Sequence, residues 1–204
     1  MKAKLLTTIV VLLLTPGLLY AKDTKDSDQL NILIDALVVC PPNSATRFVD
    51  NGDGTVCDHQ TGLMWEMKDA SDGAADLTNP RDMDNNYSWS ISGGLPDGTA
   101  YTDFLARLNG TTANTGPSEQ LGGHRDWRLP TSAELQTILD CSFSPCIDPT
   151  FGPTAAANYW SSTSFASSQG NASVAAWNAN VDFGDVILFS KDNGLRVRAV
   201  RGGR

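Results

Sequence analysis

Alternation of apolar and polar positions is clearest near the end of the chain. Between residues 175 and 183, apolar side chains occupy the odd positions, and polar side chains or alanine occupy the even ones. Because successive side chains of a strand point to opposite faces, this pattern predicts a half-buried strand with its odd positions on the core. Shorter apolar runs bounded by turn residues predict further strands at 47–50, 55–58, 61–66, 159–162, 186–189 and 195–200.

A helical spacing of apolar residues predicts two main helices. Apolar residues at 104, 105 and 108 share one face of a helix over 101–109, and Gly110 follows where it would end. The second helix is predicted to begin at Thr131, since Thr131 and Glu134 have the capping-box pattern; it should bury the apolar residues at 135, 138 and 139. A further short helix is predicted over 30–39, stopped by two prolines.

The order of these elements predicts the fold class. Strands, then helices, then strands are typical of an α+β domain with antiparallel pairing. Residues 68–100 show no periodicity and are rich in Asp, Asn, Gly and Ser, so we expect a long irregular loop region on the surface of the domain.

The first residues have the layout of a secretory signal. Two lysines precede an apolar run that ends near Ala21, and a Pro-Gly pair interrupts that run before it is long enough to span a membrane. We therefore expect a cleaved signal peptide over 1–21, a polar lead-in over 22–44 and one domain over 45–203. No membrane span should remain after cleavage. The expected location is periplasmic or extracellular, at a bacterial cell surface.

The net charge bears on the choice of partner. The chain carries a formal charge of −8, which repels the phosphate backbone of nucleic acids. We therefore expect that nucleic acid is not a partner of this protein. Neither the charge nor the sequence pattern specifies an oligomeric state.

Four cysteines follow the signal, an even number in a compartment where thiols are oxidised. Three connectivities are open, and we favour the local one, which joins Cys40 to Cys57 and Cys141 to Cys146. The alternative is a redox or metal-binding thiol set. It lacks a Cys-x-x-Cys pair and has few histidines to complete it.

Three acidic residues are weak candidates for a metal site. Asp50, Asp53 and Asp58 lie close together among glycines, and carboxylates of this kind are ligands that calcium prefers. The spacing does not match an EF-hand loop, which needs an acid where Thr61 stands. Asp, Asn and Gly are also what a tight hairpin turn requires, and we favour that interpretation. No cofactor is expected.

Aromatic and basic side chains supply the candidates for ligand binding. Tyr87 and Trp89 lie in the polar loop region, where a ring is either a platform for sugar or protein, or a pin that holds the loop to the domain. Arg196 and Arg198 share a face of the last predicted strand and either bind a ligand or pair with acids. The other tryptophans are assigned to the core, so truncating Trp127 should abolish folding while truncating Trp89 should not.

Five ordered motifs resemble one known family, the Lcl C-terminal domain family. They are RFVDNGDGTV at 47–56, TGLMW at 61–65, GHRDWRLPT at 123–131, YWSST at 159–163 and VRAVRGG at 197–203. The motifs around 127–131, the late Trp strand and the Arg-Val-Arg ending also resemble the C-type lectin-like superfamily, which includes formylglycine-generating enzymes. The resemblance implies a compact mixed fold with two helices and a long loop region. The adhesin after which the family is named binds sulfated polysaccharides through basic surface, whereas this chain is acidic.

Three functions are open at this stage. The first is a non-catalytic binding or adhesion module that recognises a polysaccharide or a surface protein, with its site in the 68–100 region. The second is an enzyme on a scaffold like that of formylglycine-generating enzymes, and the third is a structural subunit of a surface assembly. We favour the first and assign no catalytic residue, because His59 and His124 are the only histidines and the cysteines fit local staples.

Overall fold

The N-terminal sheet is built on a hairpin whose turn chemistry is local. In the computed structural model, which describes residues 39–42, 44–69, 72–111, 120–165 and 175–202, strand β1 (Phe48–Asp50) pairs antiparallel with β2 (Thr55–Asp58). Gly52 and Gly54 take positive φ angles of 76° and 85° in the turn between them. Strand β3 (Leu63–Glu66) pairs with β2, and the C-terminal β9 (Val200–Arg201) adds to β3, which gives the order β1-β2-β3-β9. The predicted hairpin and the following strand are confirmed.

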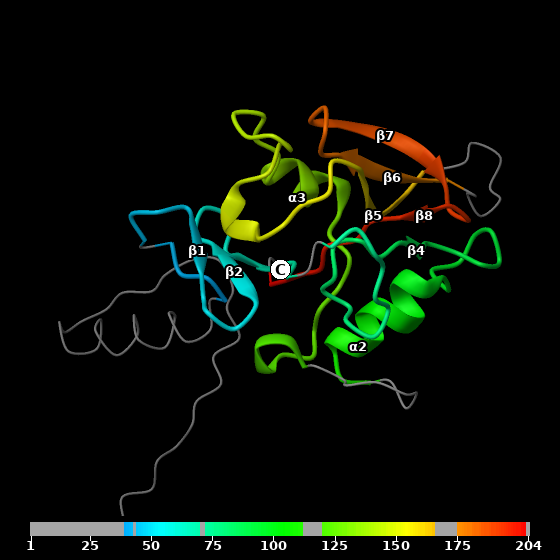
Figure 1. Cartoon of the computed structure of the whole chain (residues 1–204), viewed down its shortest axis with the longest axis horizontal. Coiled ribbons are helices and arrows are strands. Elements are labelled where there is room, and N and C mark those ends of the chain that lie inside the picture. The colour runs from blue at the N-terminus through cyan, green and yellow to red at the C-terminus, as the bar shows by residue number, and fades with distance from the viewer. Residues whose placement is uncertain (1–38, 43, 70–71, 112–119, 166–174, 203–204) are drawn as a thin grey trace, which may run out of the picture. The chain divides into compact units, whose positions relative to one another are not determined.

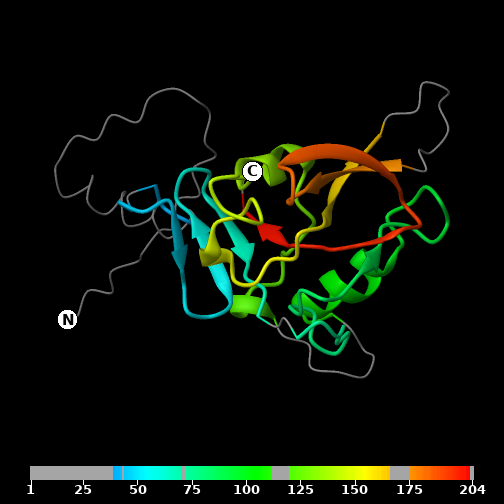
Figure 2. The same cartoon turned by 45° about the horizontal axis from the view of Figure 1, so that its top comes forward.

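Two smaller sheets follow. Strands β5 (Asn158–Ser164), β6 (Ala175–Asn180) and β7 (Asp185–Ser190) form an antiparallel sheet with β6 in the centre. Strand β4 (Tyr87–Ser88) pairs with β8 (Gly194–Leu195), so the loop region and the C-terminal segment are joined. Figures 1 and 2 show β5, β6 and β7 grouped together, with α3 beside them.

The prediction for residues 175–183 needs correction. The strand ends at Asn180, and a turn follows in which the Gly184 amide donates to the Asn180 carbonyl at 2.8 Å. Ala176 and Asn178, expected to face water, are buried, whereas Phe183, expected in the core, is 75% exposed. The reason is that β6 is covered on both faces. The core covers one face and α3 covers part of the other, so burial does not alternate along this central strand.

The helices are short. A π-helical segment η1 (Ala100–Leu105) runs into α2 (Ala106–Leu108), close to the predicted 101–109. Helix α3 (Ser132–Thr137) begins with the predicted capping box between Thr131 and Glu134. Two 3-10 turns, η2 (Leu121–Gly123) and η3 (Pro149–Phe151), complete the described elements. The α+β class is confirmed.

The core consists of two clusters of buried side chains. One gathers Trp89, Trp127 and Trp160 with residues of η1 and α2, and the other gathers Trp65 and Phe151 with residues of α3. All described residues belong to one compact unit, Leu37–Arg204. The expected signal peptide and most of the expected lead-in, including nearly all of the predicted helix over 30–39, lie outside the described residues.

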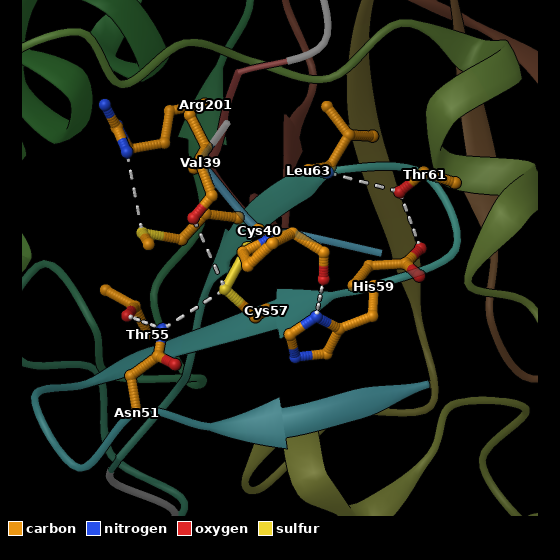
Figure 3. The surroundings of a disulfide bond; sticks show 12 residues. Val39, Cys40, Asn51, Thr55, Cys57, His59, Thr61, Leu63 and Arg201 are labelled. Carbon is orange, nitrogen blue, oxygen red and sulfur yellow. Dashed lines mark hydrogen bonds between the residues drawn. A yellow bond between two sulfur atoms is a disulfide. The ribbon is translucent and has the colours of Figure 1, made fainter. Parts of the chain in front are cut away.

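Both disulfides have the local connectivity favoured from the sequence. Cys40 pairs with Cys57 on β2, and Cys141 pairs with Cys146. Figure 3 shows the first bridge with Val39, whose carbonyl oxygen lies 3.7 Å from the Cys57 sulfur. The first bridge thus fastens the chain before β1 to the N-terminal sheet. The second lies under the β6–β7 turn, because a Cβ atom added to Gly184 would approach the Cys141 sulfur to 2.4 Å.

Reduction of the disulfides is expected to destabilise the protein. The bridges close loops with sequence separations of 17 and 5 residues. In the loop-entropy model each bridge contributes about 2 to 3 kcal/mol, the shorter loop less. We expect a clear fall in melting temperature in strong reductant, measured by circular dichroism. A Cys40→Ala/Cys57→Ala variant should lose more stability than Cys141→Ala/Cys146→Ala, and an unchanged melting temperature in reductant would contradict both assignments.

Candidate functional site: the Ser90–Asp97 loop

The segment that follows β4 forms a loop with a closed base. The amides of Trp89 and Ser90 both donate to the carbonyl of Lys191, at 3.0 and 2.9 Å, and the Gly98 amide donates to the Trp89 carbonyl at 3.1 Å. A Cβ atom at Gly98 would lie 2.2 Å from the Ser88 carbonyl oxygen, so only glycine fits where the loop returns. The backbone of the Ser90–Asp97 loop is therefore held at both ends.

The carboxylate of Asp97 fixes the first residues of the loop, Ser90 to Ser92. An oxygen of Asp97 accepts hydrogen bonds from the Ser90 hydroxyl at 2.8 Å, the Ile91 amide at 2.9 Å and the Ser92 amide at 3.3 Å. Hydrogen bonds from Ser92 and from the Ile91 amide hold the pKa of Asp97 far below its ordinary value of 3.8. A depressed pKa means that this contribution to stability is complete above pH 3.8 and is lost as the pH falls toward the folded-state pKa.

The buried Lys191 supports the later part of the loop at Gly94. Lys191 is almost fully buried, and its Nζ donates to the Gly94 carbonyl at 2.9 Å while lying 3.9 Å from the centre of the Trp89 ring. Burial lowers the pKa of Lys191. The indole N–H of Trp89 donates in turn to the Ser161 carbonyl at 2.8 Å. The loop is therefore supported by the cation–π contact between Lys191 and Trp89, and Trp89 is in turn hydrogen-bonded to strand β5.

The tip of the loop presents two aliphatic side chains to solvent. Ile91 is 77% exposed and Leu95 is 62% exposed, and both are carried by the backbone that Asp97 and Lys191 hold. A fixed loop with an apolar tip is suited to contact with another surface, since covering it removes apolar area from water without first ordering the loop. In Figure 1 the loop projects beyond the end of β4.

The comparison with family models identifies the chain. Residues 54–201 match the model of the Lcl C-terminal domain. The chain belongs to the Lcl C-terminal domain family. No curated protein matches the sequence. The match runs from the turn before β2 to the end of β9, so it includes the Ser90–Asp97 loop and every described strand except β1.

In this Lcl C-terminal domain the two candidate aromatic residues point inward, which corrects the expectation of an exposed platform. Tyr87 is 1% exposed and packs on Phe104, and Trp89 is 4% exposed and packs on Tyr101. The alternative interpretation, a ring that pins the loop to the domain, describes what the structure shows. The expected site region 68–100 therefore lacks its aromatic surface and presents aliphatic residues instead.

The two candidate arginines also serve the fold. Arg198 is buried and donates to the carbonyls of Glu66 and Phe151, at 2.8 and 2.9 Å. Arg196 is largely buried and lies 3.9 Å from the carboxylate of Asp84, the acid pairing considered from the sequence. They do not form an exposed basic stripe, which corrects that interpretation. The error arose because this segment is covered on both sides: Arg198 is as buried as its neighbours Val197 and Ala199, so neither set of alternate positions faces water.

The three acidic candidates have local partners. Asp50 accepts from the Gly52 amide and Asp53 from the Thr55 amide, as turn residues do. Asp58 is buried and paired with Arg47 at 3.0 Å; its pKa is lowered although burial opposes this, because Arg47 and Thr61 donate to the carboxylate. Within the described residues no group of three or more His, Cys, Asp or Glu side chains could hold a metal ion.

The histidines lie apart from the loop. His59 contacts the carbonyl of Pro41 near the first disulfide (Figure 3). Burial and the charge of Arg201 lower the pKa of His124. All four cysteines are in disulfides and none is a free thiol.

Sequence reasoning missed the two residues that now define the candidate site. Ile91 and Leu95 stand alone among Ser, Gly and Pro, and an isolated apolar residue gives no periodic signal. The usable signal was the turn composition that surrounds them, with Gly93-Gly94 between and Pro96 after. It predicts a sharp loop, and an aliphatic residue at the tip of such a loop has no core to enter.

Proposed function

We propose that this Lcl C-terminal domain is an exported, non-catalytic binding module that recognises a protein surface through the Ser90–Asp97 loop. The observation that carries the proposal is the pair of exposed aliphatic side chains, Ile91 and Leu95, on a base fixed by Asp97 and Lys191. Apolar groups on a preorganised loop bind at low entropic cost.

The disulfides support a location outside the cytoplasm. Two disulfides are typical of proteins in an oxidising compartment. In the part of the chain that the structure describes, no helix has the length and apolar composition needed to cross a bilayer. The periplasm or the bacterial cell surface fits the two disulfides and the signal expected over residues 1–21.

Charge favours a protein partner over a sulfated polysaccharide. The chain has a net charge of −8, and both arginines that could have formed a basic face are directed inward. A sulfated polymer would be repelled by the net negative charge of the chain, and Arg196 and Arg198 do not offset that repulsion. Aliphatic side chains also lack the ring faces and polar groups that hold sugars, so they suit an apolar patch on a protein.

Binding is expected to fail when the tip is made polar. An Ile91→Asn/Leu95→Asn variant should lose at least about tenfold in affinity for envelope proteins in a binding overlay, since two aliphatic contacts contribute about 1.5 to 3 kcal/mol each when fully buried. Its melting temperature should equal that of the unaltered protein, because neither side chain packs in the core.

The matched control is Leu77→Asn, which alters an exposed leucine elsewhere in the 68–100 region. It should bind like the unaltered protein. An array of neutral and sulfated glycans, run in parallel, should give no signal. Undiminished protein binding by the double variant, or glycan binding that survives it, would contradict the proposal.

A further inference from the structure

Strand β7 is an unprotected sheet edge. In the sheet order β5-β6-β7 it pairs with β6 on one side, and within the described residues no strand pairs with its other side. Its central residues are Val-Ile-Leu-Phe, without a charge, proline or glycine between Asp185 and Ser190. Natural edge strands are usually blunted by lysine, proline or a bulge, and this one has none of them in its paired length.

The direction of the free backbone groups follows from one side-chain contact. Asn178 on β6 lies opposite Ile187 on β7, and its Nδ2 donates to the Ile187 carbonyl at 3.0 Å, so this carbonyl faces β6. Because alternate residues of a strand direct their backbone groups to opposite sides, those of Val186 and Leu188 and the amide of Ser190 face away from β6, while the Ser190 carbonyl accepts from the amide and the side chain of Asn193, both at 3.1 Å. The edge therefore offers the amides and carbonyls of Val186 and Leu188 and the amide of Ser190, with Leu188 at the centre.

The side chains around this edge leave an apolar half-face. Leu188 is 38% exposed and lies opposite Trp177 on β6, and Phe165, 42% exposed, packs edge-on against the Trp177 ring with a centroid distance of 6.4 Å. Helix α3 covers the other part of the sheet and contacts β5, β6 and β7. A partner strand at the β7 edge would continue this half-face beside Leu188.

The residues of β7 are compatible with antiparallel pairing to β7 of a second copy. When β7 pairs antiparallel with its own copy, outward backbone groups must meet outward backbone groups, and the register that engages Val186, Leu188 and Ser190 together places Leu188 opposite its own copy. Ile187 then faces Phe189 of the second copy, and Val186 faces Ser190. Every pair is apolar or neutral, and no charge is buried.

We propose that β7 joins β7 of a second copy of this chain in a continuous antiparallel sheet, with the twofold axis at Leu188. The hydrogen bonds of the edge fix the register, and the half-face of Leu188, Trp177 and Phe165 supplies the apolar contact. Asp185 and Asp192 flank the pairing segment, and the chain as a whole is acidic, so charge repulsion opposes dimerisation. Added salt screens this repulsion and should therefore strengthen the dimer. This surface is separate from the Ser90–Asp97 loop.

The test is sedimentation velocity on the purified oxidised protein over a range of concentrations. The unaltered protein should form a dimer at high concentration, more tightly in high salt. Leu188→Lys should weaken the dimer at least about tenfold, because a lysine at the centre of the edge opposes its own copy. Phe183→Lys, which adds the same charge to an exposed apolar position on the β6–β7 turn, should dimerise like the unaltered protein, and circular dichroism should show both variants folded.

Amide hydrogen exchange supplies a second measurement of the register. The amide of Leu188 should become protected as the concentration rises, and that of Phe183 should not. The Ile91→Asn/Leu95→Asn variant should dimerise normally, which separates this inference from the proposed function. A protein that is monomeric at every concentration, or a dimer that Leu188→Lys leaves intact, would overturn the proposal.

Discussion

Replacement of Trp89 by alanine is expected to destabilise the fold by about 3 to 5 kcal/mol, the usual cost of truncating a core tryptophan. The ring packs on Tyr101, lies under the ammonium of Lys191 and donates from its indole N–H to the Ser161 carbonyl. Without it, Lys191 loses its aromatic partner and the Ser90–Asp97 loop loses its base. The sequence had suggested that Trp89 could be removed without harm, and the structure reverses that expectation.

Denaturant unfolding followed by circular dichroism measures the effect. Trp127→Ala, with an equally buried ring that donates to the Leu121 carbonyl at 3.0 Å, should cost a similar amount. The matched control is Trp177→Ala, since Trp177 is only partly buried on the open half-face of its sheet and should cost clearly less. If Trp89→Ala unfolded at the denaturant concentration of the unaltered protein, the anchoring of the loop would be disproved.

A comparable loss is expected when one partner of the buried ion pair between Glu66 and Lys68 is removed. The carboxylate and the ammonium are 2.7 Å apart, with both side chains shielded from solvent. Burial lowers the pKa of Lys68, and Glu66 opposes that shift. Removing one partner leaves the other charge buried and unpaired, which typically costs about 3 to 5 kcal/mol.

The double variant distinguishes pairing from packing. Glu66→Gln and Lys68→Met should each destabilise the protein, and Glu66→Gln/Lys68→Met should cost less than the sum of the two, because neither member of the pair is then left without the other. Equilibrium denaturation of all four proteins gives the coupling free energy. Additive losses would show that the pair does not act as a unit. The pair matters for the loop region because Lys68 also donates to the Pro80 carbonyl at 3.2 Å.

Local chemistry made much of the fold predictable. The β1–β2 hairpin has its glycines where the turn needs positive φ, and α3 begins where Thr131 and Glu134 satisfy each other's backbone amides. Each of these features is determined within a few residues, so a single sequence is enough to locate it. The same holds for the disulfides, whose favoured pairing joins cysteines that are near in sequence.

Burial in the candidate site was not predictable, because it depends on partners far along the chain. Tyr87 pairs with Leu195 across the β4–β8 ladder, and the Trp89 indole bonds a residue 72 positions away. Arg198 reaches carbonyls 132 and 47 positions away. A polar neighbourhood in the sequence predicted exposure for Tyr87 and Trp89, and tertiary packing overrode it. Once these rings are in the core, the aliphatic residues that follow them are left at the surface.

Photo-crosslinking at the loop tip tests the central claim most directly. A photoreactive phenylalanine analogue is placed at Ile91 of the exported protein, or at Leu77 as control, and cells are irradiated before analysis by mass spectrometry. The expected result is a discrete protein adduct from position 91, absent from position 77 and lost when Asp97→Ala releases the loop from its anchoring carboxylate. Equal adducts from both positions, or an adduct that persists in Asp97→Ala, would contradict recognition by a fixed apolar tip.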